Sequence, residues 1–133
     1  MREILFRGKR ADNGEWVEGN LFIPDCPDKP TEICIGSNVV RITYEVVPTT
    51  IGQFTGLTDK NGTKIFEGDI LEFTNGDDEK TPYLVVWDDF FSSWHIAQNG
   101  DRNFWDDFAD FESERFEVIG NIHDNPELLE VSQ

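Results

Sequence analysis

The chain has 133 residues, and its 27 Asp and Glu residues against 11 Lys and Arg residues give a formal net charge of −16. This length fits one domain or two small subdomains, and a charge of this sign disfavours phosphate-rich partners such as nucleic acids. The longest apolar stretch is residues 83–87, far too short to span a membrane, and no secretory signal is visible, so we expect a cytoplasmic protein with Cys26 and Cys34 reduced.

The first fifty residues are expected to form one β unit, which ends near Pro48. The turn-forming residues Asp12-Asn13-Gly14 predict an opening hairpin, because these residue types tolerate the backbone angles of tight turns. Prolines between residues 24 and 30 prevent continuous pairing there, since proline lacks the donor that a β-ladder needs. The strands expected in this unit are residues 3–9, 16–23, 32–35 and 39–47.

Residues 51–133 are expected to form the second unit, which could join the first in one compact domain. The segment Asp59-Lys60-Asn61-Gly62 lies between two runs that can each pair as strands, and it is the strongest hairpin signal in the chain. We expect Gly62 to adopt a positive φ there. The strands expected after this turn are residues 64–73, 83–87, 94–98 and 116–122.

Two stretches are candidates for short helices. In residues 103–112, Phe104, Phe108 and Phe111 share one side at helical spacing, and acidic residues lie opposite. In residues 125–130, an Asn followed by Pro and Glu gives the favoured order at a helix start. The expected fold class is therefore mainly β with one or two short helices.

Three stretches carry a family resemblance. They are residues 4–17 with Phe6-Arg7-Gly8-Lys9 and Asn13-Gly14-Glu15-Trp16-Val17, residues 52–73 with Gly52-Gln-Phe-Thr-Gly-Leu-Thr-Asp-Lys-Asn-Gly62 and Glu67-Gly68-Asp69, and residues 118–129. Together they are similar to the YopX family of phage and prophage proteins. The resemblance implies that the segment after Pro48, residues 51–133, forms an SH3-like small barrel with a short C-terminal helix, which follows the N-terminal β-hairpin unit expected at residues 1–50. It also implies a bacterial cytoplasm as the setting, and it transfers no catalytic residue.

The chain shows no recognisable catalytic, cofactor-binding or metal-binding signature. The segment from Asp59 fails the calcium-loop pattern, because its Gly stands at the fourth position and Ile70 occupies the twelfth, where glutamate is required. The four potential zinc ligands lack the close pair that structural zinc sites use; they are Cys26, Cys34, His95 and His123. The paired acids are interpreted as solvated loop residues; they are Asp77-Asp78-Glu79, Asp88-Asp89 and Asp106-Asp107. We therefore expect a protein that is not an enzyme and that needs no cofactor.

Charge is spread unevenly, and this asymmetry suggests two candidate interaction surfaces. Residues 1–66 hold eight Lys or Arg and nine Asp or Glu, for −1, whereas residues 67–133 hold three and eighteen, for −15. The first surface is the basic cluster of Arg2, Arg7, Lys9 and Arg10. The second is the aromatic and acidic set of Phe104, Trp105, Asp106, Asp107 and Asp110. The basic cluster either contacts phosphates or pairs with acids of this chain or of a neighbouring subunit. The aromatic and acidic set either covers the core with its rings or binds a basic partner.

The function predicted from these features is that of a non-enzymatic phage or prophage accessory protein. It would bind protein partners, preferably basic ones, through its acidic surface, or associate with a second copy of itself. One alternative is a nucleic-acid-binding small barrel that uses the cluster between Arg2 and Arg10. Another is an acidic mimic of DNA that inhibits a host protein. No membrane partner is expected.

Overall fold

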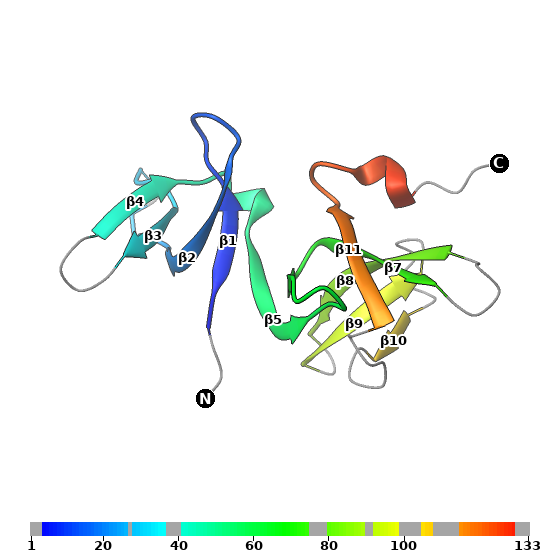
Figure 1. The fold of residues 1–133 in the computed structure, drawn as a ribbon. Coiled ribbons are helices and arrows are strands. Elements are labelled where there is room, and N and C mark those ends of the chain that lie inside the picture. Colours follow the sequence, from blue (N-terminus) through cyan, green and yellow to red (C-terminus); the bar gives the residue numbers. More distant parts are fainter. Residues whose placement is uncertain are drawn as a thin grey trace. The chain divides into compact units, whose positions relative to one another are not determined.

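The computed structural model describes residues 4–26, 28–36, 41–74, 80–89, 92–98, 105–107 and 115–129. Within these residues the chain is mainly antiparallel β-sheet, and the helical segments there are short 3₁₀ turns (Figure 1). The mainly β class expected from the sequence is therefore confirmed. Residue contacts divide the chain into two compact units, unit 1 at Met1–Phe54 and unit 2 at Thr55–Gln133.

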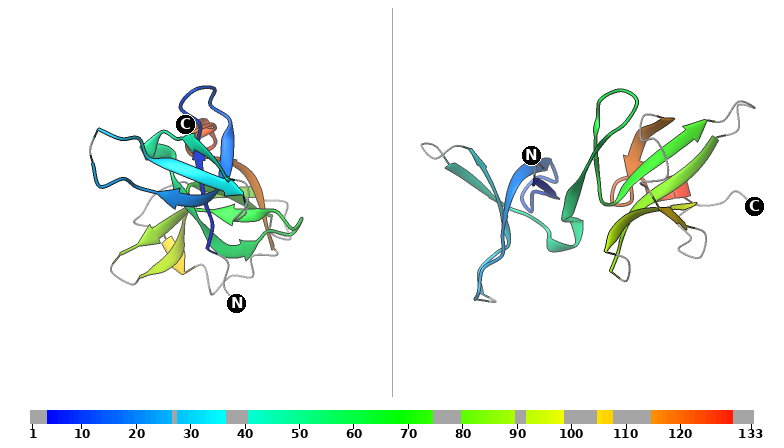
Figure 2. Two further views of the ribbon diagram at one scale, coloured as in Figure 1. Left: turned by 90° about the vertical axis from the view of Figure 1, so that its left-hand side faces the viewer. Right: turned by 90° about the horizontal axis from the view of Figure 1, so that it is seen from below.

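Unit 1 is an antiparallel meander followed by a short 3₁₀ turn. Its elements are β1 (Phe6–Lys9), β2 (Trp16–Phe22), β3 (Glu32–Gly36), β4 (Arg41–Glu45), η1 (Pro48–Thr50) and the first residues of β5 (Gly52–Thr58). The expected hairpin is confirmed, since β1 pairs with β2 across the turn that contains Gly14. β5 continues the sheet on the other side of β1, where Gln53 lies opposite Phe6. Figure 2 shows these strands from two further directions.

The sheet of unit 1 curls until its last strand meets its first. An isolated bridge joins Arg10 to Val46, and the Ala11 amide donates to the Glu45 carbonyl at 2.9 Å. Val46 is almost fully buried, and a Cβ atom at Gly8 would lie 3.1 Å from the Val46 Cβ. Glycine at position 8 therefore permits the close approach on which this closure depends.

Unit 2 is built on a five-stranded antiparallel sheet with the order β10-β9-β8-β7-β11. Its strands are β6 (Lys64–Phe66), β7 (Asp69–Thr74), β8 (Lys80–Asp88), β9 (Ser93–Gln98), β10 (Trp105–Asp107) and β11 (Phe116–Asn121). β7 to β10 form a meander, and β11 returns to pair with β7. β6 pairs with the end of β5. β10 and β11 stand at the two ends of this order, so the small barrel that the resemblance implies stays a prediction.

The core of unit 2 forms because inward positions alternate along these strands. Its fully buried members are Ile65, Leu71, Val85, Ile96 and Phe116. The Tyr83 ring meets the Phe116 ring edge to face, with centroids 5.8 Å apart. β6, β7, β8, β9 and β11 therefore each contribute an apolar side chain to a single cluster, which fixes the register of the sheet.

The structure differs from the sequence expectations in three places. The helix expected at residues 103–112 is wrong at its centre, because Trp105–Asp107 form β10 against β9; its other residues lie outside the described part of the chain. The expected strand 64–73 is interrupted at Gly68, which adopts φ +89° in a turn between β6 and β7. The C-terminal segment forms a 3₁₀ helix, η4 (Pro126–Leu129).

Candidate functional site

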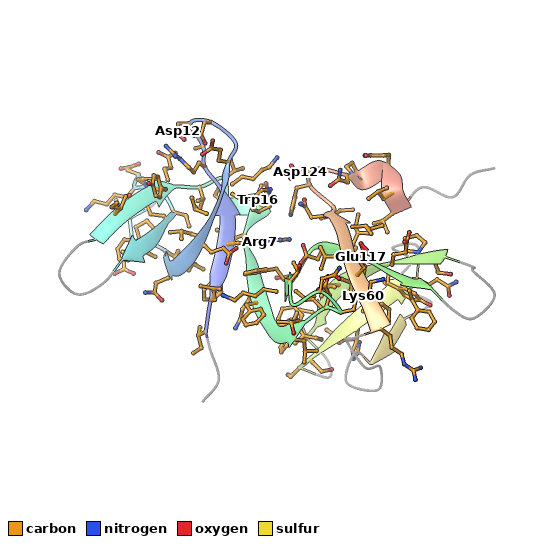
Figure 3. All side chains as sticks on the ribbon, viewed as in Figure 1. Arg7, Asp12, Trp16, Lys60, Glu117 and Asp124 are labelled. Atoms are coloured by element: carbon orange, nitrogen blue, oxygen red, sulfur yellow. The ribbon has the colours of Figure 1, made fainter. Side chains whose placement is uncertain are left out.

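Two cations of the predicted basic cluster gather around one aromatic ring. Arg7 and Lys9 are two residues apart on β1, so their side chains leave the same face of the sheet. The β1–β2 register places Lys9 directly opposite Trp16. The Arg7 guanidinium lies 4.7 Å from the Trp16 ring centroid, and Figure 3 labels both residues. The Lys9 ammonium lies 5.7 Å from the same centroid. We call Arg7, Lys9 and Trp16 the cation–ring face. Arg2 lies outside the described residues.

Arg10 belongs to a different arrangement on the opposite side of the strand. Its Nε and one terminal nitrogen donate to the two carboxylate oxygens of Asp12 at 3.0 and 2.7 Å. The Glu15 carboxylate lies 3.8 Å away, and the guanidinium stacks 4.3 Å from the Tyr44 ring centroid. The hydrogen bonds from Arg10 lower the pKa of Asp12, and the same contact raises the pKa of Arg10. Acids of its own hairpin therefore offset the charge of Arg10.

An open pocket of about 440 Å³ lies beside this arrangement. Its lining residues are Arg10, Ala11, Asp12, Thr43, Tyr44 and Glu45. One cation and two acids share this lining with one aromatic ring, so the pocket has no single charge preference. Sequence reasoning missed Tyr44, because its position beside Arg10 depends on the closure of the sheet.

The second predicted surface is described only through its backbone. Trp105, Asp106 and Asp107 form β10, and they pair with Ala97, Ile96 and His95 of β9, respectively. Phe104 and Asp110 lie outside the described residues. The aromatic and acidic set therefore stays a prediction, although its central part is now placed on an edge strand of unit 2.

Asp59 is a buried carboxylate of unit 2 that accepts three backbone amides. It is 4% exposed, and one oxygen accepts the amides of Asn61 at 2.8 Å and Thr63 at 2.9 Å. The other oxygen accepts the amide of Val118 in β11 at 2.9 Å. Burial by itself raises the pKa of Asp59, but these backbone amides together with Lys60 lower it more, so the net pKa is depressed. The expected positive φ of Gly62 is confirmed at +82°.

Two more turns lie in the family-like stretches 52–73 and 118–129. Asp69 is buried and accepts the Phe66 amide at 2.8 Å, and the Gly68 amide donates to the Val85 carbonyl at 3.0 Å. After β11, the side-chain oxygen of Asn121 accepts the amides of the two residues before Asn125 at 3.0 and 2.9 Å. The hydrogen bonds of Asp59, Asp69 and Asn121 therefore stabilise turns of the fold.

His95 sits in a chain of polar side chains at one end of β8 and β9. It is 2% exposed, and its Nε2 shares a 2.9 Å hydrogen bond with Ser93 Oγ. Its Nδ1 lies 3.4 Å from an Asp88 carboxylate oxygen. Asp88 lies at the end of β8, and Ser93 and His95 lie two residues apart on the paired strand β9. The sequence contains this spacing, but sequence reasoning did not use it. We interpret the contacts with Ser93 and Asp88 as the way in which the polar ring atoms of the buried His95 find partners.

Within the described ranges, no group of three His, Cys, Asp or Glu residues is placed to hold a metal ion. Cys26 is exposed and Cys34 is partly buried, and both are free. No helix among the described residues is long and apolar enough to cross a membrane.

Comparisons with known proteins agree with this fold. The YopX protein family matches residues 5–130, so the resemblance predicted from the sequence is confirmed. The structure is similar to the crystal structure of protein EF1440 from Enterococcus faecalis, with a TM-score of 0.56, 24% sequence identity, and coverage of 98% of this chain and 100% of that chain. None of the curated proteins matches the chain. The likeness to the crystal structure shows the fold alone.

Proposed function

The chain belongs to the YopX protein family, and we propose that it is a non-enzymatic phage or prophage accessory protein that binds a basic protein partner. The binding surface is the acidic surface of unit 2, and the setting is the cytoplasm of a bacterial host. The protein acts by association, without a cofactor.

The observation that carries this proposal is the separation of charge between the two compact units. Unit 1 holds six Lys or Arg and eight Asp or Glu, for −2, whereas unit 2 holds five and nineteen, for −14. In the described part of unit 2, Asp59 and Asp69 are buried, while Asp89, Asp124 and Glu127 are exposed. At least these three acids of unit 2 therefore face solvent.

A concentrated field of this sign selects partners by electrostatics. It repels phosphate backbones at long range, attracts basic protein surfaces, and raises the rate at which they associate. Complementary charge gives specificity and rapid encounter more than it gives affinity. A basic host or phage protein is the class of partner that fits such a unit.

The experiment is affinity purification of the tagged full-length protein from its host, followed by mass spectrometry. The variant Asp89→Lys/Glu127→Lys reverses two exposed acids of unit 2. Its matched control, Glu18→Lys/Asp25→Lys, makes the same charge change at exposed acids of unit 1. We expect a basic partner that is retained at physiological salt, is released by high salt, and is reduced only by the unit 2 variant. A partner that is not basic, or equal recovery with both variants, would contradict the proposal.

A second candidate is binding of nucleic acid by the cation–ring face, because cations beside an aromatic ring are typical of single-strand binding sites. Two observations weaken it. The Arg7 guanidinium lies over the Trp16 ring on which a base would stack, and Arg10 is engaged by Asp12. The DNA-mimic version of the main proposal is tested by the same purification, since its partner would be a DNA-binding protein.

A further inference from the structure

We propose that a row of three side chains on the sheet of unit 1 binds an arginine side chain of a basic protein. The row consists of Phe22 on β2, Glu32 on β3 and Glu45 on β4, and we call it the aromatic–acid row. It lies in unit 1, whereas the proposed function uses the acidic surface of unit 2, so either can fail without the other.

The register of three neighbouring strands forms the row. Figure 1 shows β2, β3 and β4 side by side. Glu32 lies opposite Phe22 in the β2–β3 pair and opposite Glu45 in the β3–β4 pair. Directly opposed residues leave the same face of a sheet, with Cβ atoms about 4.5–5.5 Å apart. One aromatic ring and two carboxylates are therefore neighbours, although the sequence separates them.

The row faces away from the buried side of this sheet. Ile33, the residue after Glu32, is fully buried, and successive side chains along a strand point to opposite faces. Phe22 is 55% exposed, and Glu45 is exposed as well. Aromatic residues are enriched at protein–protein interfaces, so an exposed phenylalanine beside two acids suits a surface that a partner covers.

The two glutamates of the row oppose each other without a counter-charge. Like charges that lie directly opposite on paired strands destabilise a sheet. Within the described residues, neither the Glu32 nor the Glu45 side chain takes part in an ion pair or a hydrogen bond. A cation placed between the two carboxylates relieves their repulsion. The row therefore favours a cationic partner and repels an anionic one.

Arginine fits the row better than other cations do. Its planar guanidinium can lie flat on the Phe22 ring while the N–H groups at its edge donate to carboxylates. Lysine presents a compact ammonium, which cannot make two parallel hydrogen bonds to one carboxylate. Calcium takes about six to eight oxygen ligands, and the row offers only two carboxylates. Thr43 and Glu45 also line the open pocket, which leaves space for the aliphatic part of a long side chain.

A side chain within a protein is a better occupant than free arginine. Free arginine carries its own carboxylate, which the two glutamates of the row repel. The net charge of −16 attracts basic proteins at long range. The row then selects the side chain at short range, so the partner is a protein that exposes arginine.

The test is an NMR titration of the isotope-labelled full-length protein with the acetylated and amidated tripeptide Gly-Arg-Gly. We expect the backbone amide signals of Phe22, Glu32 and Glu45 to shift together and to approach saturation. The controls are the same tripeptide with Lys or Leu in place of Arg, and free arginine. We expect each control to bind the row at least about threefold more weakly.

Two double variants show whether the carboxylates of the row bind the peptide. Glu32→Gln/Glu45→Gln removes both charges and preserves side-chain shape. The matched control, Glu18→Gln/Asp25→Asn, makes the same charge change at exposed acids of the same unit. We expect the first variant to weaken binding at the row about fivefold and the control to change it by less than about twofold. Circular dichroism checks that both variants remain folded.

The ring has its own test, because Phe22→Leu keeps an apolar side chain but removes the stacking surface. It should reduce the preference for the Arg tripeptide over the Lys tripeptide. Absence of shifts at the row would overturn the inference, as would equal weakening by the two double variants. Equal binding of the Leu tripeptide would assign the row to apolar side chains instead. The partner purification tests unit 2 with the row intact, so the two proposals fail separately.

Discussion

Replacement of Asp59 tests whether one buried carboxylate fastens the family-like turn to the last strand of unit 2. Asp59→Ala removes the acceptors of three backbone amides, at 2.8, 2.9 and 2.9 Å. A hydrogen bond to a charged group contributes about 1.5–3 kcal/mol. Water can reach the exposed turn residues Asn61 and Thr63, so we count only the Val118 bond in full. The expected loss in the free energy of unfolding is about 2–4 kcal/mol.

The assay is urea denaturation at neutral pH, with Asp89→Asn as the control for loss of an exposed acid in the same unit. That control is expected to change stability by less than about 0.5 kcal/mol. Asp59→Asn separates charge from shape, because it keeps one carbonyl oxygen but presents an amide group to a backbone donor. We expect it to destabilise the protein less than Asp59→Ala does. An unchanged urea midpoint for Asp59→Ala would refute the reasoning.

The pH dependence of the same variant checks the ionised state of Asp59. The folded-state pKa is depressed, so the carboxylate contributes stability above the unfolded-state pKa of about 3.9 and loses this contribution as pH falls through the folded-state value. The stability difference between wild type and Asp59→Asn should therefore be widest near neutral pH and should narrow in acid below about pH 4. A difference that does not change with pH would show that charge plays no part.

Three further predictions concern glycines and net charge. Gly62→Val should destabilise the protein by about 1–3 kcal/mol, because φ is +82° there; an unchanged denaturation midpoint would contradict this. Gly19→Ala places a Cβ atom 2.3 Å from the Cys34 carbonyl oxygen, and we expect about 1–3 kcal/mol of destabilisation by calorimetry. The melting temperature should rise between low and physiological salt, because the acids of unit 2 repel one another. A falling melting temperature would indicate that favourable ion pairs dominate.

Local rules explain the parts of the fold that the sequence predicted correctly. Turn-forming residues placed a hairpin at Asp59–Gly62, and the positive φ of Gly62 follows from its lack of a side chain. The turn residues that follow Asp12 and the proline at position 48 indicated where strands of unit 1 end. Predicting the mainly β class and the uneven charge required only the residue types and their order along the chain. These features depend on neighbours within a few positions, and such neighbours are visible in the sequence.

The candidate site was predicted only in part, because strand pairing decides which cations act together. Sequence proximity grouped Arg7, Lys9 and Arg10 in one cluster. Alternation along β1 separates Arg10 from the other two, and the adjoining turn brings Asp12 to it. Trp16 joins Arg7 and Lys9 because the β1–β2 register sets it opposite Lys9.

The sequence by itself determined the β class, the main turns and the separation of charge along the chain. Only the tertiary structure decided that Trp105–Asp107 form a strand, since pairing with β9 outweighs phenylalanines at helical spacing. It also decided that Asp59 holds Val118, which lies 59 residues further along the chain. Contacts of this kind arise from register and sheet closure, and these depend on the packing of the whole core.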